Sequence, residues 1–424
     1  MHHVILGAGP AGVIAAETIR KHRPDDRITV IGAEREPPYS RMAIPYLLAG
    51  NIPESGTWLR HDGEHFARQR IELMQARVTA VDSQARTVTL PSGDKLPFDR
   101  LLIATGSRPE KPPIPGMDLP GVHPCWTLED ARHIMEGAKP GARVVQIGAG
   151  FIACIIMEAL AARGVKLSVV EMADRMVPRM MGPVAGTMIK EWCVKQGVQV
   201  FTGTRVEAIA AASPLRVQLS DGQALDADLV IRATGVKPSI GYLEESGITC
   251  LAGVLTDARM QTNVPGIYAA GDCAEAFDKI TGRTMVSAIQ PNASDQARVA
   301  GLNMAGLEAE LPGVTQINVL DTLGLVSASF GDWQGAPGDE AAEVTDREGA
   351  RHLSLRFNGD VMVGANAIGW TQHIGVLRGL VEGQVRLGAW KRTLLEDPTR
   401  IMEAYLDAAQ AQGRWQGADD ARRR

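Results

Sequence analysis

The chain has 424 residues, enough for two or three domains with a sizeable hydrophobic core. Its 44 basic and 49 acidic residues give a net charge of −5, so there is no general basic excess to suggest a nucleic-acid-binding protein. No window of about 18 residues is apolar and free of charge, and the N-terminus lacks a charged leader or cleavage site, so neither a membrane span nor a signal peptide is expected.

The N-terminal residues predict a βαβ unit that binds a dinucleotide. A short apolar strand at residues 3–7 runs into Gly7, Gly9 and Gly12, and a helix is expected from Val13 to about Arg23. The next strand, "RITVIG", leads to Glu34, an acid 22 residues after Gly12 that can accept ribose hydroxyls. The glycines allow a tight turn and close helix packing, and the helix N-terminus offers N–H groups to phosphates.

The same pattern recurs in the middle of the chain. The strand "ARVVQIGAG" ends in Gly148 and Gly150, a helix is expected from Phe151 to about Arg163, and the strand "KLSVV" ends at Glu171. Ala153 takes the third motif position, where a small residue is tolerated. Glu171 suits two free ribose hydroxyls and would repel a 2′-phosphate, and the nearest arginine is four residues on, which favours NADH over NADPH.

Three further apolar strands end in small or acidic residues. In the segments "FDRLLIATGSRP" (98–109) and "ADLVIRATGVKP" (227–238) an apolar strand ends in Ala-Thr-Gly, and "GIYAAGDCAEA" (266–276) contains Gly271 and Asp272. An acid at the carboxyl end of a strand faces the ligand crevice of an open α/β sheet.

With these motifs in this order, nearly the whole chain resembles the pyridine nucleotide–disulfide oxidoreductase superfamily, the flavoprotein reductases with two dinucleotide sites. The resemblance is to its branch without a redox disulfide, which includes ferredoxin and rubredoxin reductases and NADH oxidases. It implies an α/β fold with two nested Rossmann-like domains, which bind FAD and NAD, and a C-terminal α+β interface domain. The implied boundaries are 1–113 with 242–311 for FAD, 114–241 for NAD, and 312–424 for the interface domain.

The resemblance also assigns cofactor residues. Those implied for FAD are Gly7, Gly9, Pro10, Ala11, Gly12, Glu34, Arg41, Val78, Thr105, Gly106, Gly271 and Asp272. Those implied for NADH are Gly148, Gly150, Phe151, Ile152, Glu171 and Gly235. Pro291 opens a helical stretch whose N-terminus would face the flavin and stabilise its reduced, negatively charged form.

The C-terminal part differs in character from the rest. "HLSLRFNGDVMVGANAIGW" predicts two strands around an Asn-Gly turn, and "HIGVLRGLVEGQVRLGAW" predicts a helix that begins near His373. In the related reductases this domain usually makes a homodimer. His373 is expected to be structural, because the His-Pro proton relay of the disulfide reductases is absent, and residues 413–424 are expected to be a frayed basic tail.

The segment "EPPYSRMAIPYLLAG", residues 36–50, is implied to face the flavin. In thiol-dependent relatives it carries a redox cysteine, and the best alignment places Met42 there; a thioether forms no thiolate. In reductases of iron–sulfur proteins an arginine precedes a lysine, and here Arg41 is followed by Tyr46. The lysine's usual glutamate partner is also replaced, by Ile155, and Glu158 is at most a partial substitute. No catalytic residue is certain; the candidates that line the flavin are Arg41, Met42, Tyr46 and Pro291.

The five cysteines form no CxxC or CxxxxC pair and no metal-ligand spacing, so free thiols in a reducing cytoplasm and no metal are expected. The favoured function is an enzyme in which NADH reduces FAD and the flavin passes electrons directly to an external acceptor, preferably a ferredoxin or rubredoxin. The alternatives are a coenzyme A-disulfide or persulfide reductase or NADH oxidase, and an FAD- and NAD-binding subunit of a larger redox complex. No nucleic-acid partner is expected.

Overall fold

The computed structural model describes residues 1–370 and 372–413. The chain forms two compact units, each assembled from three separate stretches. Unit 1 comprises Met1–Glu110, Trp126–Arg132 and Val236–Val314. Unit 2 comprises Lys111–Cys125, His133–Gly235 and Thr315–Arg424. The division into three domains drawn from the sequence stays a prediction.

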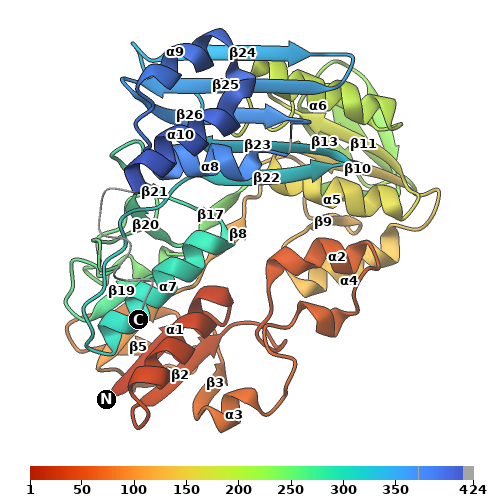
Figure 1. The fold of residues 1–424 in the computed structure, drawn as a ribbon. Helices are drawn as coiled ribbons and strands as arrows, with labels where there is room; N and C mark the ends of the chain where they lie inside the picture. Colours follow the sequence, from red (N-terminus) through yellow and green to blue (C-terminus); the bar gives the residue numbers. More distant parts are fainter. Residues whose placement is uncertain (371, 414–424) are drawn as a thin grey trace. The chain divides into compact units, whose positions relative to one another are not determined.

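Unit 1 is built on a five-stranded parallel sheet. Its strands, in spatial order, are β19 (Ile267–Ala269), β7 (Arg100–Ile103), β1 (His2–Leu6), β2 (Arg27–Gly32) and β3 (Ile71–Gln75). Four of the strands bury apolar runs, as parallel strands covered on both faces do, whereas β3 at the edge of the sheet is mostly exposed. Helices α1 (Pro10–His22) and α7 (Gln290–Met304) run side by side in the same core (Figure 1). Gly301 permits this approach, because a Cβ there would lie 3.1 Å from the carbonyl oxygen of Ala15.

Smaller elements surround this sheet. Three antiparallel strands, β4 (Ala80–Asp82), β5 (Thr87–Thr89) and β6 (Lys95–Pro97), form one further sheet, and β18 (Val254–Leu255), β20 (Ala274–Phe277) and β21 (Thr284–Val286) form another. Strand β8 (Ser107–Pro109) pairs with β17 (Val236–Pro238). The connection from β2 to β3 contains η1 (Arg41–Ala43), α2 (Ile44–Leu48), η2 (Glu54–Thr57) and α3 (His65–Arg68), and η3 (Gly241–Leu243) follows β17.

Unit 2 repeats the same architecture. Its parallel sheet has the order β12 (Gln199–Thr202), β11 (Lys166–Glu171), β10 (Arg143–Ile147), β16 (Leu229–Arg232) and β9 (Val122–Pro124). Helices α5 (Phe151–Ala162) and α6 (Pro183–Lys195) belong to this unit, and α4 (Leu128–Gly137) begins in a stretch counted with unit 1. A three-stranded antiparallel sheet follows: β13 (Val206–Ala210), β14 (Leu215–Leu219) and β15 (Ala224–Ala227).

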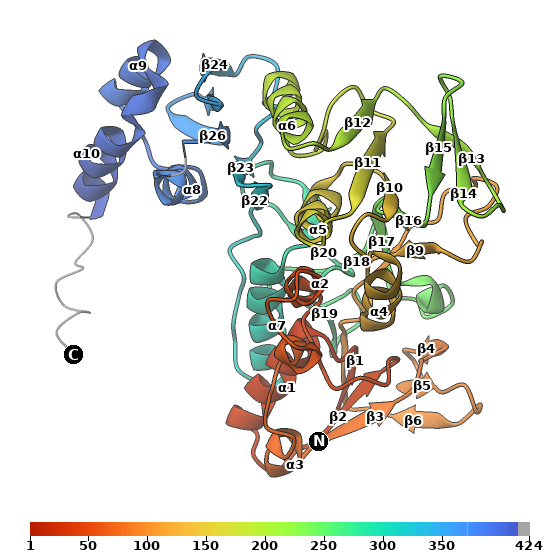
Figure 2. The same ribbon diagram turned by 90° about the vertical axis from the view of Figure 1, so that its right-hand side faces the viewer.

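The C-terminal part of unit 2 is a five-stranded antiparallel sheet covered by helices. The order is β22 (Ile317–Thr322), β23 (Leu325–Gly331), β26 (Val361–Ile368), β25 (Arg351–Asn358) and β24 (Glu340–Asp346). One face carries α8 (Ile374–Glu382), α9 (Ala389–Glu396) and α10 (Ile401–Gly413), with η4 (Pro398–Arg400) between the last two (Figure 2). Helices α5 and α6 contact the sheet as well.

Most of the elements expected from the sequence are confirmed. Each glycine-rich turn joins a strand of a parallel sheet to the helix that follows it, β1 to α1 and β10 to α5, so the predicted α/β class with two Rossmann-like folds is confirmed. The strand pair around the Asn-Gly turn is also present, as β25 and β26. The single helix expected after it is wrong, because α8 ends at Glu382 and a glycine with positive φ, Gly388, precedes α9.

None of the helices in the described part of the chain is long and apolar enough to cross a membrane. The basic tail expected at residues 413–424 falls almost wholly outside the described residues, apart from Gly413 at the end of α10.

Candidate functional site

The first glycine-rich turn has a shape that only glycine allows. Gly7 has a φ of +114°, and a Cβ there would lie 2.1 Å from the carbonyl oxygen of Ala104. A Cβ on Gly12 would lie 1.9 Å from the carbonyl oxygen of Gly7, so the helix packs directly on the turn. The space beside Gly9 is open, since a Cβ there would meet nothing within 4 Å. Gly7 and Gly12 therefore make the tight turn and the close helix packing that the sequence predicted, and Gly9 leaves space for a ligand.

The N-terminus of α1 is suited to bind an anion. Gly9 is its N-cap residue, no side chain caps the helix, and the first turn contains no acidic residue. The N–H groups of this turn therefore keep their hydrogen-bonding capacity, and the helix dipole adds positive potential. Pro10 and Ala11 begin the helix, and the proline costs no hydrogen bond at this position. A dinucleotide pyrophosphate fits these donors and the open space at Gly9.

The second glycine-rich turn has the same geometry. Gly148 has a φ of +99°, and a Cβ would lie 2.4 Å from the carbonyl oxygen of Ala233. Gly150 is the N-cap residue of α5, which again has open space, no capping side chain and no acid in its first turn. Phe151 and Ile152 form the first turn of α5 and are partly exposed. This turn fits a second pyrophosphate for the same reasons.

The two Ala-Thr-Gly segments follow strands next to the glycine-rich turns. Thr105 follows β7, and its hydroxyl donates to the carbonyl oxygen of Ser239 at 2.9 Å. Gly106 (φ +63°) and Gly235 (φ +106°) both border open space, because a Cβ on either would meet nothing within 4 Å. Val78, the predicted adenine contact, lies on the loop after β3 and packs partly against the core of unit 1.

Glu34 follows β2 and is held by side chains of the segment downstream. One carboxylate oxygen accepts from the hydroxyl of Tyr39 at 2.5 Å, and the other accepts from Arg41 at 2.7 Å. Burial is the main reason that the pKa of Tyr39 is raised well above its usual range, so this hydroxyl remains a donor. The acid predicted to bind ribose is therefore part of a preformed hydrogen-bond network.

Arg41 is fixed on several sides. Besides Glu34, its guanidinium donates to the carbonyl oxygen of Trp126 at 2.7 Å. It also lies 5.1 Å from the ring of Trp126 and 5.8 Å from the ring of Tyr39, within the range of cation–π attraction. The indole N–H of Trp126 donates to the carbonyl oxygen of Ser107 at 2.9 Å. Reasoning from sequence missed both aromatic residues. For Trp126, no local spacing signals a contact across 85 residues. Tyr39 lies only five residues after Glu34, within the segment already expected to face the flavin.

Asp272 lies in unit 1 after β19, as expected. Its carboxylate accepts from the hydroxyl of Ser107 at 3.0 Å, and burial raises the pKa of Asp272. The neighbouring Gly271 donates its N–H to the side-chain oxygen of Gln296 on α7 at 2.8 Å. The side-chain nitrogen of Gln296 is buried and has no protein partner among the described residues. A partly buried acid and an unpaired amide donor are what a polar ligand would satisfy.

Helix α7 begins close to the segment that carries Arg41. Gln290 is its first residue, and its side-chain oxygen accepts from the hydroxyl of Ser40 at 2.8 Å. Pro291, predicted to be the first residue of this helix, is its second residue, and no acid lies in the first turn. The dipole of this helix N-terminus therefore favours nearby negative charge.

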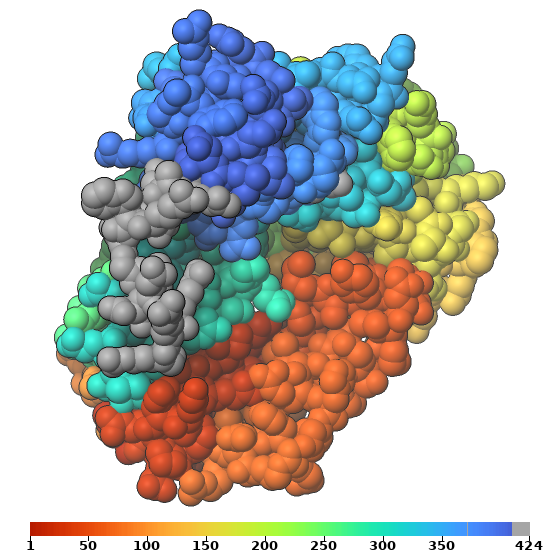
Figure 3. Space-filling view, viewed as in Figure 1, coloured from red at the N-terminus to blue at the C-terminus, as the bar shows by residue number. Residues whose placement is uncertain are grey.

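Two of the three residues that depart from the family patterns are exposed. Met42 on η1 and Tyr46 on α2 are 50% and 58% exposed, and the part of unit 1 around α2 lies at the surface in the space-filling view (Figure 3). On α5, Ile155 is partly exposed and Glu158 is exposed. Partial burial and the nearby Asp321 raise the pKa of Glu158.

Glu171 is held differently from Glu34. It is 7% exposed, and its two carboxylate oxygens accept from the backbone N–H groups of Ala149 and Ala173, each at 2.8 Å. Arg175 donates to the carbonyl oxygen of Met181 and pairs with Asp174, so its guanidinium is engaged within its own loop. The second site thus presents a fixed carboxylate with no free arginine beside it among these residues.

The cysteines near the two turns are unreactive in character. Cys273 is fully buried and donates to the carbonyl oxygen of Ile103 at 3.4 Å, and burial raises its pKa to about 11. Burial raises the pKa of Cys154 well above its usual range and that of Cys193 to about 12. These three thiols stay protonated near neutral pH and are poor nucleophiles.

The family model described as "Pyridine nucleotide-disulphide oxidoreductase" matches residues 1–298. An NADH oxidase of Methanocaldococcus jannaschii is 36% identical over 73% of this chain and 71% of its own. The biphenyl dioxygenase system ferredoxin–NAD(+) reductase component of Paraburkholderia xenovorans is 29% identical over 91% of this chain and 94% of its own. The structure of an NAD-dependent persulfide reductase from A. fulgidus superposes with a TM-score of 0.85 at 29% identity, over 92% of this chain and 78% of that one.

Proposed function

Because the chain belongs to the pyridine nucleotide-disulphide oxidoreductase family, we propose that this FAD-dependent NADH oxidoreductase passes electrons from its flavin directly to an iron–sulfur protein. One observation carries the choice of acceptor. The segment that would face the flavin has Met42 where thiol-dependent relatives have a cysteine, and the three cysteines with the strongest burial have raised pKa values.

FAD is assigned to the first glycine-rich turn. The free N–H groups at the start of α1 would bind its pyrophosphate, with Gly9 leaving room for the backbone to approach. Glu34 would accept the ribose hydroxyls and Asp272 would accept a hydroxyl of the ribityl chain. Arg41, already fixed by Trp126, would lie beside the phosphates or the ring.

NADH is assigned to the second glycine-rich turn. The start of α5 would bind the pyrophosphate, and Glu171 would accept the two hydroxyls of the adenosine ribose. A buried carboxylate would repel a 2′-phosphate, and Arg175 is engaged elsewhere, so both features favour NADH over NADPH.

Flavin suits this reaction because it accepts a hydride and releases electrons one at a time. The protein needs no acid, base or nucleophile for such a transfer, and its residues bind and orient. The N-terminus of α7 has no capping side chain, so its positive potential would stabilise negative charge on a flavin bound beside it, a preorganised electrostatic contribution.

The relatives use at least three classes of acceptor by their names, so similarity alone does not choose among them. A persulfide or disulfide reductase needs a thiolate beside the flavin, which Met42 cannot supply. A ferredoxin reductase needs none. The ferredoxin–NAD(+) reductase component also matches over 91% of this chain.

The experiment is a screen of acceptors with a spectroscopic check. NADH oxidation is followed with ferredoxin, rubredoxin, quinone, oxygen and coenzyme A disulfide, and an anaerobic NADH titration counts the electrons taken up. We expect turnover with an iron–sulfur protein, and two electrons per flavin. A thiolate–flavin charge-transfer band, or two further electrons per flavin, would overturn direct transfer. NADH that binds tightly without bleaching the flavin would instead indicate a non-catalytic subunit.

The domain boundaries, the location and the assembly also belong to this proposal. Residues 1–113 with 242–311 would bind FAD, 114–241 would bind NADH, and 312–424 would form the interface of a cytoplasmic homodimer. Light scattering of the purified protein tests the assembly, and a monomer at micromolar concentration would contradict it.

A further inference from the structure

The connection between β2 and β3 forms a closed loop. The N–H of Ser40 donates to the carbonyl oxygen of Thr57, and the N–H of Leu59 donates to that of Pro38, both at 2.9 Å. Tyr39 and Trp58 form an isolated β-bridge between these two bonds. The pairing of residues 38–40 with residues 57–59, which we call the neck, therefore closes residues 40–57 into a loop. We call them the 40–57 loop; it carries Arg41, Met42 and Tyr46.

One arginine outside this loop connects its two sides. Arg132 donates to Glu36, just before the neck, at 2.9 Å. It also donates through two nitrogens to Glu54, near the far end of the loop, at 2.9 and 2.6 Å. This bidentate arrangement requires the planar guanidinium, and a lysine could not reproduce it. The Arg132 guanidinium is also the main reason that the pKa of Glu54 is lowered.

Arg132 is itself held in place. It lies near the start of α4, where Asp130 accepts from the N–H groups of Trp126 and Thr127 at 3.1 and 2.8 Å. The hydroxyl of Thr127 accepts from the N–H of Asp130 at 3.1 Å, which completes a reciprocal cap. The backbone that presents Arg132 to the loop is therefore rigid.

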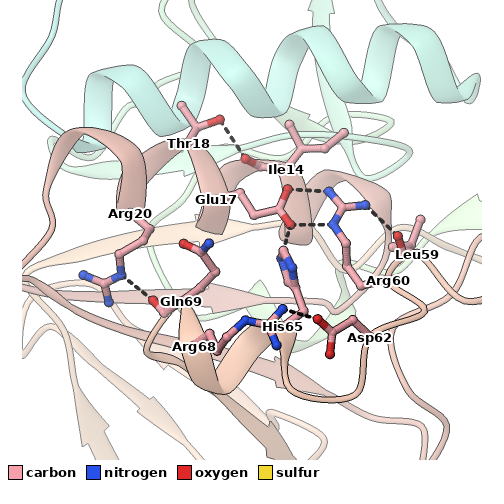
Figure 4. A network of polar contacts seen from close by, with 10 residues as sticks. All are labelled: Ile14, Glu17, Thr18, Arg20, Leu59, Arg60, Asp62, His65, Arg68 and Gln69. Carbon is pink, nitrogen blue, oxygen red and sulfur yellow. Dashed lines mark hydrogen bonds and ion pairs between the residues drawn. The ribbon is translucent and has the colours of Figure 1, made fainter.

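The exit of the loop has a second anchor on α1 (Figure 4). Arg60, just after the neck, donates to Glu17 through two nitrogens, one of them at 2.7 Å, and the ring of His65 contacts the same carboxylate at 2.8 Å. This network fixes the chain beyond the loop. Arg132 differs because it bridges a residue before the neck and a residue within the loop.

We propose that Arg132 is a positioning residue for flavin reduction, which holds the 40–57 loop closed through Glu36 and Glu54. Its side chain acts on the cofactor site only through the loop, by fixing the segment that carries Arg41, Met42 and Tyr46. The inference rests on the proposed function, because it takes this segment to face the flavin. Opening of the neck would loosen Arg41, whose side chain is already 36% exposed.

Arg132→Gln removes the bridge, and Arg143→Gln is the matched control. Arg143 also makes a bidentate pair, with Asp228 at 3.1 and 2.7 Å, and its side chain is 41% exposed against 40% for Arg132. Amide hydrogen exchange across residues 40–57 is measured first, in the full chain freed of flavin. The FAD dissociation constant, the rate of flavin reduction and the KM for NADH are measured next.

In Arg132→Gln we expect the rate of amide hydrogen exchange across residues 40–57 and the FAD dissociation constant each to rise about fivefold. This is the size of effect expected for the loss of a partly exposed ion pair. The rate of flavin reduction falls by a similar factor, the KM for NADH does not change, and Arg132→Lys is intermediate. Adding Glu54→Gln to Arg132→Gln causes little further change, since both remove the same contact. Arg143→Gln changes none of these quantities.

If amide hydrogen exchange across the 40–57 loop is no faster in Arg132→Gln than in Arg143→Gln, the inference is overturned, whatever the FAD affinity and the rate of flavin reduction. Faster exchange with unchanged FAD affinity and reduction rate would also overturn it, because Arg132 would then be merely structural. Failure of the unaltered protein to bind FAD or oxidise NADH would instead refute the proposed function on which the inference rests.

Discussion

The two glycine-rich turns share one backbone design and differ in how each holds its acid. Gly7 and Gly148 both have positive φ, and both are pressed against the carbonyl oxygen that follows a parallel strand. Glu34, however, is held by the side chains of Tyr39 and Arg41. Glu171 is held by two backbone N–H groups of its own turn and the loop beside it.

This difference shows which site depends on distant parts of the chain. Glu171 is placed by residues within two positions of its motif, so the second site is set by its own βαβ unit. Glu34 is linked through Arg41 to Trp126, which lies 85 residues after Arg41 in the chain. The first site therefore depends on tertiary contacts that a local change elsewhere can disturb.

The largest effect is expected where the two turns differ in packing. Gly12→Val adds a side chain whose Cβ would lie 1.9 Å from the carbonyl oxygen of Gly7. The equivalent position of the second turn already carries a Cβ, since it is Ala153. We expect loss of bound FAD and about 3 kcal/mol or more of destabilisation. Flavin absorbance per protein and thermal unfolding measure these effects.

Ala153→Gly is the control for that change. It should cost about 1 kcal/mol through helix propensity and leave FAD bound. A Gly12→Val protein that keeps its flavin would show that the first turn does not bind the cofactor.

The second effect separates the two acids by function. Glu171→Gln loses the charged acceptor for two ribose hydroxyls, worth about 10- to 100-fold in affinity. We expect the KM for NADH to rise by that factor while FAD content is unchanged, as steady-state kinetics and the flavin spectrum would show. Glu34→Gln should instead lower FAD content and leave the KM for NADH unchanged. Loss of FAD from Glu171→Gln would contradict the assignment of the two sites.

A smaller effect tests the side chains around Glu34. Tyr39→Phe removes one hydrogen bond to the carboxylate, worth about 1 kcal/mol, so FAD should bind about fivefold more weakly. Fluorescence titration of the flavin-free protein measures this change. Tyr268→Phe, at a buried tyrosine on β19, is the control and should leave FAD affinity unchanged. Equal effects of the two substitutions would mean that Tyr39 acts by packing alone.

The smallest effect concerns a feature that the two turns share. Each has a buried cysteine nearby, Cys273 in unit 1 and Cys154 in unit 2, and burial raises the pKa of both. Replacing either by alanine should change turnover by less than about twofold, because a protonated thiol takes no part in direct transfer. Turnover with the iron–sulfur acceptor measures this. Loss of activity in Cys273→Ala would revive the thiol mechanism.

The local motifs made both Rossmann-like folds predictable. A strand, a glycine-rich turn and a helix within one stretch of chain fix their own geometry, because only glycine fits at Gly7 and Gly12. The start of α7 at a proline was predictable for the same reason. The helix expected after His373 was less predictable. Its pattern of apolar residues continues past Glu382, but the chain turns at Gly383 and Gly388.

The sequence by itself determined the fold class, the two acids and the absence of a cysteine at Met42, since each is encoded in residues that are close together in the chain. Only the tertiary structure decided what surrounds Arg41 and how Arg132 joins Glu36 to Glu54. These contacts cross 78 to 96 residues and depend on side-chain direction. A spacing in one dimension carries no such information, because packing brings these groups together only after the chain has folded.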